Sequence, residues 1–103
     1  MPKNYLVSRH PAAIDWISQQ MPVDQVITHL DINLIEVDDA VIGTLPIHVA
    51  AQVCERQAKY VHLSLDIPSQ WRGKELDTVE FKQCAPRLEE FSISREKTDN
   101  ESR

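Results

Sequence analysis

The sequence predicts one small α/β domain with a short, mostly parallel sheet and helices packed against it. The chain has 103 residues, of which 42% are hydrophobic, and both values suit a single globular domain. Short segments rich in β-branched residues alternate with segments whose apolar residues recur at helical spacing. Because helices of crossover length separate strands, a mostly parallel sheet is favoured.

The amino-terminal part of the chain supplies a strand, a helix and a second strand. Residues 4–8 are rich in β-formers, and Pro11 then suits the first turn of a helix. Apolar side chains on one face continue that helix to about Gln20, where a proline soon stops it. Residues 25–30 have the β-branched content of a second strand.

The clearest transition from strand to helix lies in the middle of the chain. The apolar residues 40–42 meet Gly43-Thr44-Leu45-Pro46, in which glycine allows a tight turn, threonine can cap and proline starts a helix. We expect this helix to end near Gln57 and residues 60–65 to form a further strand.

The carboxyl-terminal part is expected to add one helix and one edge strand. Residues 78–85 have helical composition. Residues 88–93 either continue as helix or form an edge strand, and we favour the strand. Beyond them the chain is charged and lacks apolar anchors, so residues 95–103 are predicted to form a disordered tail on a domain of residues 1–94.

The charge of the chain limits the ligands that it can take. The formal net charge is −5 and there is no run of lysine or arginine, which argues against binding to duplex nucleic acid. A small anion needs only one or two arginines and a helix N-terminus, so this class of ligand stays open. A short chain also has a modest core, and a homodimer is therefore expected.

Other function classes lack their sequence signals. No apolar run approaches the ~20 residues of a membrane span, and no secretion signal is visible, so we expect a cytoplasmic protein without membrane contact. Cys54 and Cys84 are expected to be free thiols. No group of histidine, cysteine and acidic residues has metal-ligand spacing, and neither a metal nor a cofactor is predicted.

Polar residues follow the predicted strands, where a parallel sheet places its ligands. The loops beyond the carboxyl ends of such strands diverge, and helix N-termini point into the gap. Hydroxyl, imidazole and guanidinium groups gather at these positions, and the set suits phosphate. The residues delivered by the four strands in turn are Ser8, Arg9 and His10, then His29 and Asp31, then Gly43 and Thr44, then Ser64 and Asp66.

Most of these residues also have a purely structural interpretation. Ser8 either caps the first helix or contacts a ligand, and His10 is either functional or simply exposed. Arg9 directly follows a buried strand, which favours an anion contact over a solvated charge. His29 and His62 alternate with apolar neighbours, which favours hydrogen-bonded structural histidines.

Two further segments have the same double interpretation. Gly43 and Thr44 lack the glycine-rich phosphate pattern and the Walker lysine, so a plain turn explains them equally well. Trp71 and Arg72 form a pairing that can stack a base and hold a phosphate, or else Trp71 covers the sheet edge.

Several motifs in one order resemble a known family. They are Val7-Ser8-Arg9-His10-Pro11 with Ala13 and Trp16, His29-Leu30-Asp31, Val41-Ile42-Gly43-Thr44-Leu45-Pro46 with Ala50-Ala51 and Cys54, Tyr60-Val61-His62-Leu63-Ser64-Leu65, and Trp71-Arg72-Gly73-Lys74-Glu75-Leu76. With these motifs the chain resembles the small CRISPR-associated accessory family found beside type III interference genes. Where a glycine is expected after the middle helix, the chain has Gln57-Ala58-Lys59.

The resemblance implies a fold, a ligand and an activity. The family looks like a minimal relative of the Rossmann-like sensor domains, the CARF-like fold, that bind cyclic oligoadenylates. The resemblance implies a ring nuclease that linearises cyclic tetra-adenylate and switches off type III CRISPR signalling. Because no metal-ligand cluster is visible in the sequence, we expect this cleavage to be independent of metal. The two-fold symmetry of that ring suits a homodimer.

The same resemblance suggests roles for the candidate residues. Arg9 would stabilise transition-state charge and His10 would act as acid or base, since histidine ordinarily titrates near neutral pH. Ser8 and Thr44 would contact phosphate, while Trp71 and Arg72 would close over the ligand. Gly43, Asp31 and Ser64 complete the predicted ligand-binding set. The alternatives are a non-catalytic sponge for the same ligand and a regulatory subunit of a CRISPR complex.

Overall fold

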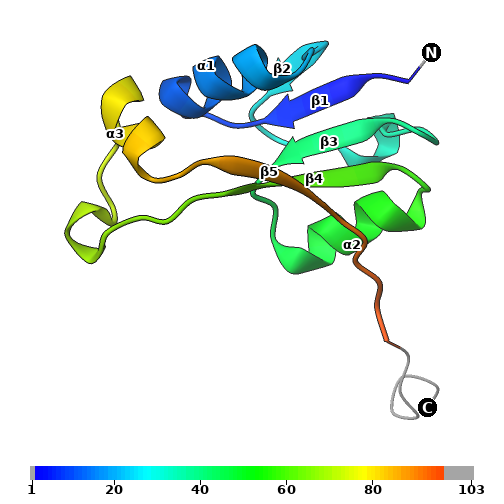
Figure 1. The fold of residues 1–103 in the computed structure, drawn as a ribbon. Coiled ribbons are helices and arrows are strands. Elements are labelled where there is room, and N and C mark those ends of the chain that lie inside the picture. The colour runs from blue at the N-terminus through cyan, green and yellow to red at the C-terminus, as the bar shows by residue number, and fades with distance from the viewer. Residues whose placement is uncertain (1, 97–103) are drawn as a thin grey trace.

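One five-stranded sheet organises the protein, and the computed structural model describes residues 2–96 (Figure 1). In spatial order the strands are β2 (Gln25–Ile27), β1 (Asn4–Val7), β3 (Ala40–Gly43), β4 (Lys59–Ser64) and β5 (Arg87–Phe91). Neighbouring strands from β2 to β4 are parallel, and only the β4–β5 pair is antiparallel. The prediction of a mostly parallel sheet in an α/β domain, compatible with a Rossmann-like fold, is confirmed.

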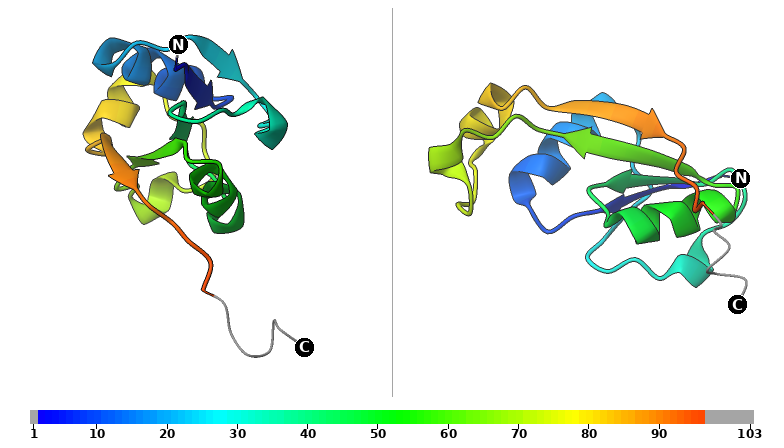
Figure 2. Two further views of the ribbon diagram at one scale, coloured as in Figure 1. Left: turned by 90° about the vertical axis from the view of Figure 1, so that its right-hand side faces the viewer. Right: turned by 90° about the horizontal axis from the view of Figure 1, so that it is seen from below.

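Three helices cover the two faces of this sheet. They are α1 (Pro11–Gln20), α2 (Ile47–Glu55) and α3 (Thr78–Gln83), and short 3₁₀ turns lie at Ile32–Leu34 and Ser69–Trp71. The side chains of adjacent residues on a strand point to opposite faces of the sheet. Tyr5 accordingly packs in the core cluster under α2, whereas Leu6 packs in the cluster under α1 and α3. Figure 2 shows α1 and α2 on opposite sides of the sheet.

The central strand β3 is buried along its whole length, as expected for a parallel strand covered on both faces. Just before it, the Asp39 carboxylate is 3% exposed and accepts hydrogen bonds from the backbone N–H groups of Lys3 and Glu36, both at 2.9 Å. Asp39 therefore ties the start of β1 to the start of β3, and its buried charge is satisfied by backbone donors.

The boundaries differ from the predicted ones by a few residues. The first two strands end at Val7 and Ile27, earlier than expected, although the Ser8 N–H still donates to the Ile27 carbonyl at 3.1 Å. The expected Thr44 cap is wrong: Pro46 is the N-cap of α2, and no side chain caps that end. The antiparallel edge strand β5 confirms the assignment at the carboxyl-terminal end.

Other expectations fall on particular residues or lie outside the described ones. Cys54 and Cys84 are free thiols, as expected. No helix within residues 2–96 is long and apolar enough to cross a membrane. Of the predicted tail, Arg95 forms an ion pair with Glu55 at 3.1 Å, and residues 97–103 lie outside the described part of the chain.

The missing glycine after α2 has a structural consequence. Gln57 takes a φ of 63°, and the N–H groups of Gln57 and Ala58 donate to carbonyls of the last helical turn at Cys54 and Val53. This is the left-handed helix end that glycine ordinarily occupies, because a Cβ atom crowds the backbone there.

We therefore expect Gln57→Gly to stabilise the protein. Removing the strained Cβ outweighs the extra entropy of a glycine in the unfolded chain, so the free energy of unfolding should rise by about 0.5–1 kcal/mol. Urea denaturation measures the change. Gln57→Ala is the matched control, since it shortens the side chain but keeps the Cβ; an equal gain in both variants would contradict the explanation.

Candidate functional site

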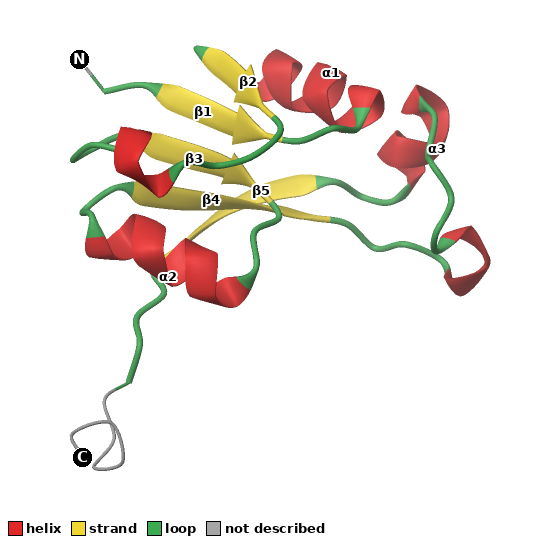
Figure 3. Ribbon diagram, turned by 180° about the vertical axis from the view of Figure 1, so that it is seen from behind, coloured by secondary structure: helices red, strands yellow, loops and turns green. Residues whose placement is uncertain are grey.

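A cavity of about 600 Å³ lies at the carboxyl ends of β1, β3 and β4. Figure 3 shows these strand ends pointing toward α3 and the chain segment that leads to it. The lining comes from the ends of these three strands, from Thr28 after β2, from α1 and α3, and from the segment between β4 and α3. They are Leu6, Val7, Ser8, Arg9, His10, Ala12, Ala13, Ile17, Thr28, Gly43, Thr44, Leu63, Leu65, Ile67, Lys74, Leu76 and Phe81.

The pairing of β1 with β3 brings two predicted groups together. Val7 lies opposite Gly43 at the last position of the parallel ladder. The residues that follow each strand, Ser8 to His10 on one side and Thr44 on the other, therefore emerge beside each other and line one cavity. Five of the nine predicted site residues meet there.

Arg9 is exposed at the cavity, and a histidine holds its guanidinium. Its Nη2 donates to Nε2 of His29 at 3.0 Å. Since a guanidinium only donates, Nε2 of His29 must carry no proton in this arrangement. His29 was expected within a strand but lies beyond the end of β2 in an exposed turn, so its structural role is to orient Arg9.

Ser8 and His10 form a small turn ahead of α1. The backbone N–H of His10 donates to Oγ of Ser8 at 3.2 Å. Ser8 does not cap the helix, because the N-cap position belongs to His10 and no side chain caps this end. An Oγ atom that accepts from the backbone can still donate its own proton, and Ser8 can thus offer that proton to an anion.

The turn after β3 is fixed by hydrogen bonds from two side chains. Thr44 donates its hydroxyl proton to the Leu63 carbonyl at 3.2 Å, so it presents lone pairs to the cavity rather than a donor. The Tyr60 hydroxyl accepts from the Leu45 N–H at 3.0 Å and lies 3.2 Å from the Gly43 carbonyl and 2.6 Å from Nδ1 of His62.

Tyr60 is a supporting residue that sequence reasoning missed. It is 2% exposed, and burial raises the pKa of its hydroxyl, although the hydrogen bond from Leu45 opposes that effect. The phenol therefore stays protonated and keeps its place in the network. Its alternation with apolar neighbours in β4 only indicated a core residue.

Lys74 is the second residue that sequence reasoning missed as a candidate. It lines the cavity, whereas its motif neighbours Trp71 and Arg72 do not. Its ammonium group forms an ion pair with Glu80 and lies 5.3 Å from the centre of the Trp71 ring. The hydrogen bond from Lys74 lowers the pKa of Glu80, so the pair is ionised and part of the lysine charge is already compensated.

Two other predicted ligand contacts are engaged elsewhere. Asp31 caps the 3₁₀ turn by accepting from the Asn33 N–H at 3.0 Å, and Ser64 donates to Glu89 at 2.8 Å across the β4–β5 pair. Asp66 pairs with Arg87, and hydrogen bonding to Asp66 raises the pKa of that guanidinium. None of these residues lines the cavity.

The electrostatic character of the cavity contrasts with that of the whole chain. The formal net charge is −5, yet no carboxylate is among the described residues that line the cavity. Arg9 and Lys74 are its cationic side chains. Charge of one sign in a concave site with apolar walls favours an anionic ligand.

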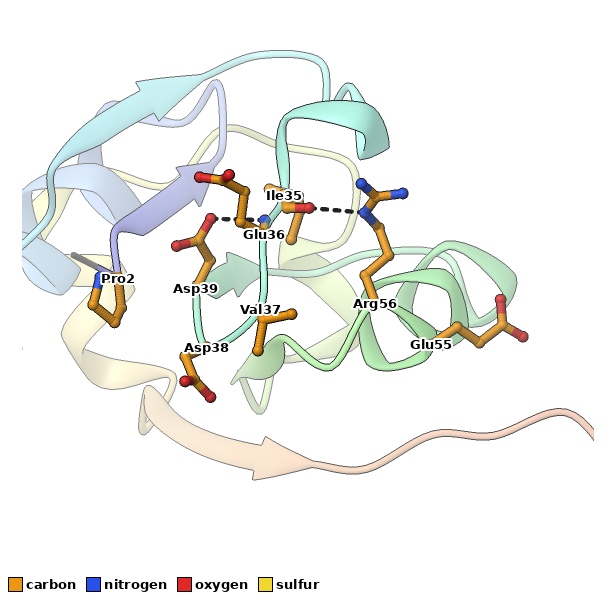
Figure 4. Close-up of a pocket in the computed structure, with 8 residues that line it drawn as sticks. All are labelled: Pro2, Ile35, Glu36, Val37, Asp38, Asp39, Glu55 and Arg56. Carbon is orange, nitrogen blue, oxygen red and sulfur yellow. Dashed lines mark hydrogen bonds between the residues drawn. The ribbon is translucent and has the colours of Figure 1, made fainter.

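A second hollow of about 750 Å³ lies at the amino edge of the sheet (Figure 4). Carboxylates dominate its lining, which also includes Arg56. Two charged groups of this lining already have partners: Asp39 accepts from backbone N–H groups, and Nε of Arg56 donates to the Ile35 carbonyl at 2.8 Å. This hollow is therefore a structural junction between β3 and α2. Within residues 2–96, no three histidine, cysteine or acidic residues are placed to hold a metal ion.

The fold and this edge define a small α/β protein, compatible with a Rossmann-like fold, with a cavity beyond its parallel strands whose described lining has two cationic side chains and no carboxylate. A comparison with protein-family models matches residues 5–94 to the Cas_VVA1548 family of CRISPR-associated proteins. The chain belongs to this family, as its motifs indicated. No curated protein and no solved structure matches it.

Gly43 has a structural task that is separate from ligand binding. Its φ is +152°, and a Cβ atom there would lie 2.6 Å from the Val7 carbonyl oxygen. Glycine thus permits β1 and β3 to approach at the floor of the cavity.

Gly43→Ala should accordingly destabilise the protein by about 2–4 kcal/mol, as measured by urea denaturation. Gly73→Ala is the control, because Gly73 also has a positive φ, +83°, but nothing lies within 4 Å of its added Cβ. That variant should lose only about 1 kcal/mol. Equal losses would show that crowding against Val7 is not the reason for glycine at position 43.

Proposed function

We propose that this protein binds cyclic tetra-adenylate at the carboxyl edge of its sheet and linearises it, which switches off type III CRISPR signalling. The observation that carries the proposal is the cavity with Arg9 and Lys74 and no carboxylate, in a chain whose net charge is −5. Membership of a CRISPR-associated family supports it, and so does what the resemblance implies for that family, a relationship to Rossmann-like domains that bind cyclic oligoadenylates.

The proposed reaction uses the substrate's own ribose as nucleophile. The 2′-hydroxyl oxygen attacks the adjacent phosphorus and loses its proton to a base, while the 5′-oxygen leaves and gains a proton. The products are a 2′,3′-cyclic phosphate and a 5′-hydroxyl. The protein has to align the attacking and leaving oxygens and stabilise the charge on the phosphorane.

The residues at the cavity supply these functions. Arg9, held by His29, would face the phosphate and stabilise the developing charge. Ser8 would donate its hydroxyl proton to a phosphate oxygen, because its Oγ accepts only from the His10 backbone. His10 is exposed at the same edge, and we assign it the role of acid or base.

Arg9→Ala should abolish or severely slow ring opening while the fold stays intact. Loss of one preorganised charge-stabilising donor ordinarily costs about 10²–10³-fold in rate. Arg9 is exposed, so the melting temperature should change little. Single-turnover cleavage of cyclic tetra-adenylate, followed by chromatography, measures the effect. Arg9→Lys keeps the charge without the planar fork and should recover binding better than catalysis.

The matched control for this prediction is Arg95→Ala, which removes an exposed arginine that does not line the cavity. Wild-type cleavage by Arg9→Ala would move the site away from the end of β1 and make Lys74 and Arg72 the leading candidates. Tight binding without any linear product from wild-type protein would identify a sponge instead of an enzyme.

Cleavage should proceed undiminished in EDTA. The nucleophile and the charge-stabilising group of the proposed reaction come from the ribose and from Arg9, and no carboxylate that could hold a divalent ion is among the described cavity residues. Rates with EDTA and with added Mg²⁺ or Mn²⁺ should agree. A loss of activity that only the added metal restores would overturn this mechanism.

The active form should be a homodimer. One cavity offers a single Arg9, whereas the proposed ring has four phosphates and two-fold symmetry, so two cavities about one axis match it. Light scattering coupled to size exclusion should give twice the 11.8 kDa chain mass. A monomer mass, both with and without cyclic tetra-adenylate, would contradict this prediction.

A further inference from the structure

The cavity is divided into a polar rim and an apolar interior. The polar side chains of the lining lie at the rim, where strand ends and loops meet solvent: Ser8, Arg9, His10, Thr28, Thr44 and Lys74. The interior is built from the core under α1 and α3. Its residues are Leu6, Ala12, Ala13, Ile17, Leu63 and Phe81, all less than 9% exposed.

Side chains of the segment between β4 and α3 extend the apolar zone. Leu65, Ile67 and Leu76 are half-buried and face the same space as the interior residues. A ligand that reaches both zones must therefore carry an anionic group joined to an uncharged group that can be buried. A nucleotide has this composition: its phosphate suits Arg9, and its base suits the interior.

Trp71, the other candidate for stacking a base, is placed less well for this role. It does not line the cavity, and the ammonium group of Lys74 lies 5.3 Å from the centre of its ring. A base that stacked on that same face would have to displace a cation–π contact.

From these observations we infer that the apolar interior is a base subsite that selects adenine without hydrogen bonds from side chains. The inference rests on the proposed function and names how the same site chooses its base. The interior residues have no polar side-chain atoms, so the polar groups on the edge of a base buried among them lose water without a side-chain partner there. Adenine carries fewer such groups than guanine, and it should be favoured for that reason alone.

Methyl NMR with mononucleotides tests the subsite without requiring ring cleavage. Adenosine 5′-monophosphate should shift the methyl signals of Leu63, Leu65, Ile67 and Leu76 through the ring current of the base. Ribose 5-phosphate, which lacks the base, should move only signals at the rim. Equal effects of the two probes, or no effect of either on these methyls, would overturn the subsite.

The selection rule is tested with two altered bases. Guanosine 5′-monophosphate should bind about tenfold or more weakly than the adenine nucleotide, because guanine buries two unpaired donor groups, its ring N–H and its amine, where adenine buries only its amine. Purine riboside 5′-monophosphate, which lacks the exocyclic amine, should bind at least as tightly as the adenine nucleotide. A tenfold loss with this probe would reveal hydrogen-bond readout of adenine and contradict the inference.

A variant that fills the subsite provides an independent test. Ile67→Trp should weaken binding of the adenine nucleotide at least tenfold while leaving ribose 5-phosphate unaffected. Val79→Trp is the matched control, since Val79 is 65% exposed on α3 and does not line the cavity. Unchanged affinity of Ile67→Trp for the adenine nucleotide would overturn the proposal, and if that variant fails to fold, the comparison of probes on the wild-type protein decides.

Two further outcomes would assign the interior differently. Base-dependent shifts at the Trp71 indole and not at the interior methyls would restore the stacking role of Trp71. Methyl shifts with dodecyl phosphate but not with the adenine nucleotide would show that the interior takes an alkyl chain. Either result contradicts the base subsite. If the ring is cleaved but the interior methyl signals do not shift, the base subsite is wrong and the proposed function stands. If these methyl signals shift with the base but no ring is cleaved, the base subsite stands and the proposed function is wrong.

Discussion

The close approach of β1 and β3 at Gly43 is the constraint on which the candidate site depends. A Cβ atom at this position would lie 2.6 Å from the Val7 carbonyl oxygen, so glycine alone lets the parallel ladder run to its last residue pair. Because the ladder continues to this pair, the segments that follow β1 and β3 begin side by side. Ser8 to His10 and Thr44 then line one cavity, with Tyr60 holding the turn beneath them.

Charge is distributed unevenly between the two edges of the sheet. At the amino edge, a hollow is lined by the carboxylates of Glu36, Asp38, Asp39 and Glu55. The Asp39 carboxylate accepts hydrogen bonds from two backbone N–H groups and so connects the start of β1 to the start of β3. At the carboxyl edge, the described lining has cations and no carboxylate. A chain with a net charge of −5 can in this way keep one surface attractive to a small anion while the remainder repels long polyanions.

If Arg9 binds a phosphate as proposed, its contact with His29 prepares a flexible side chain for that role. Arginine loses rotamer freedom on binding an anion, and a hydrogen bond to His29 removes part of that freedom in advance. The histidine accepts through an unprotonated ring nitrogen, so the guanidinium keeps its full charge. Lys74 differs, because Glu80 and Trp71 already engage its ammonium group, and the charge that it brings to the cavity is partly compensated.

The sequence by itself determined the order of strands and helices, the mostly parallel sheet, the edge strand and the family. Periodicity and turn residues act over a few positions, and the strand-end rule then placed Ser8, Arg9, His10, Gly43 and Thr44 at one edge. The tertiary structure alone decided which of the strand-end residues meet. Asp31 and Ser64 follow or end strands as the others do, yet they bond to Asn33 and Glu89. It also put Lys74 rather than Trp71 and Arg72 at the cavity, and left Gln57 in a conformation that glycine favours. Side-chain direction in a loop depends on contacts between segments far apart in the chain, and local sequence patterns do not encode those contacts.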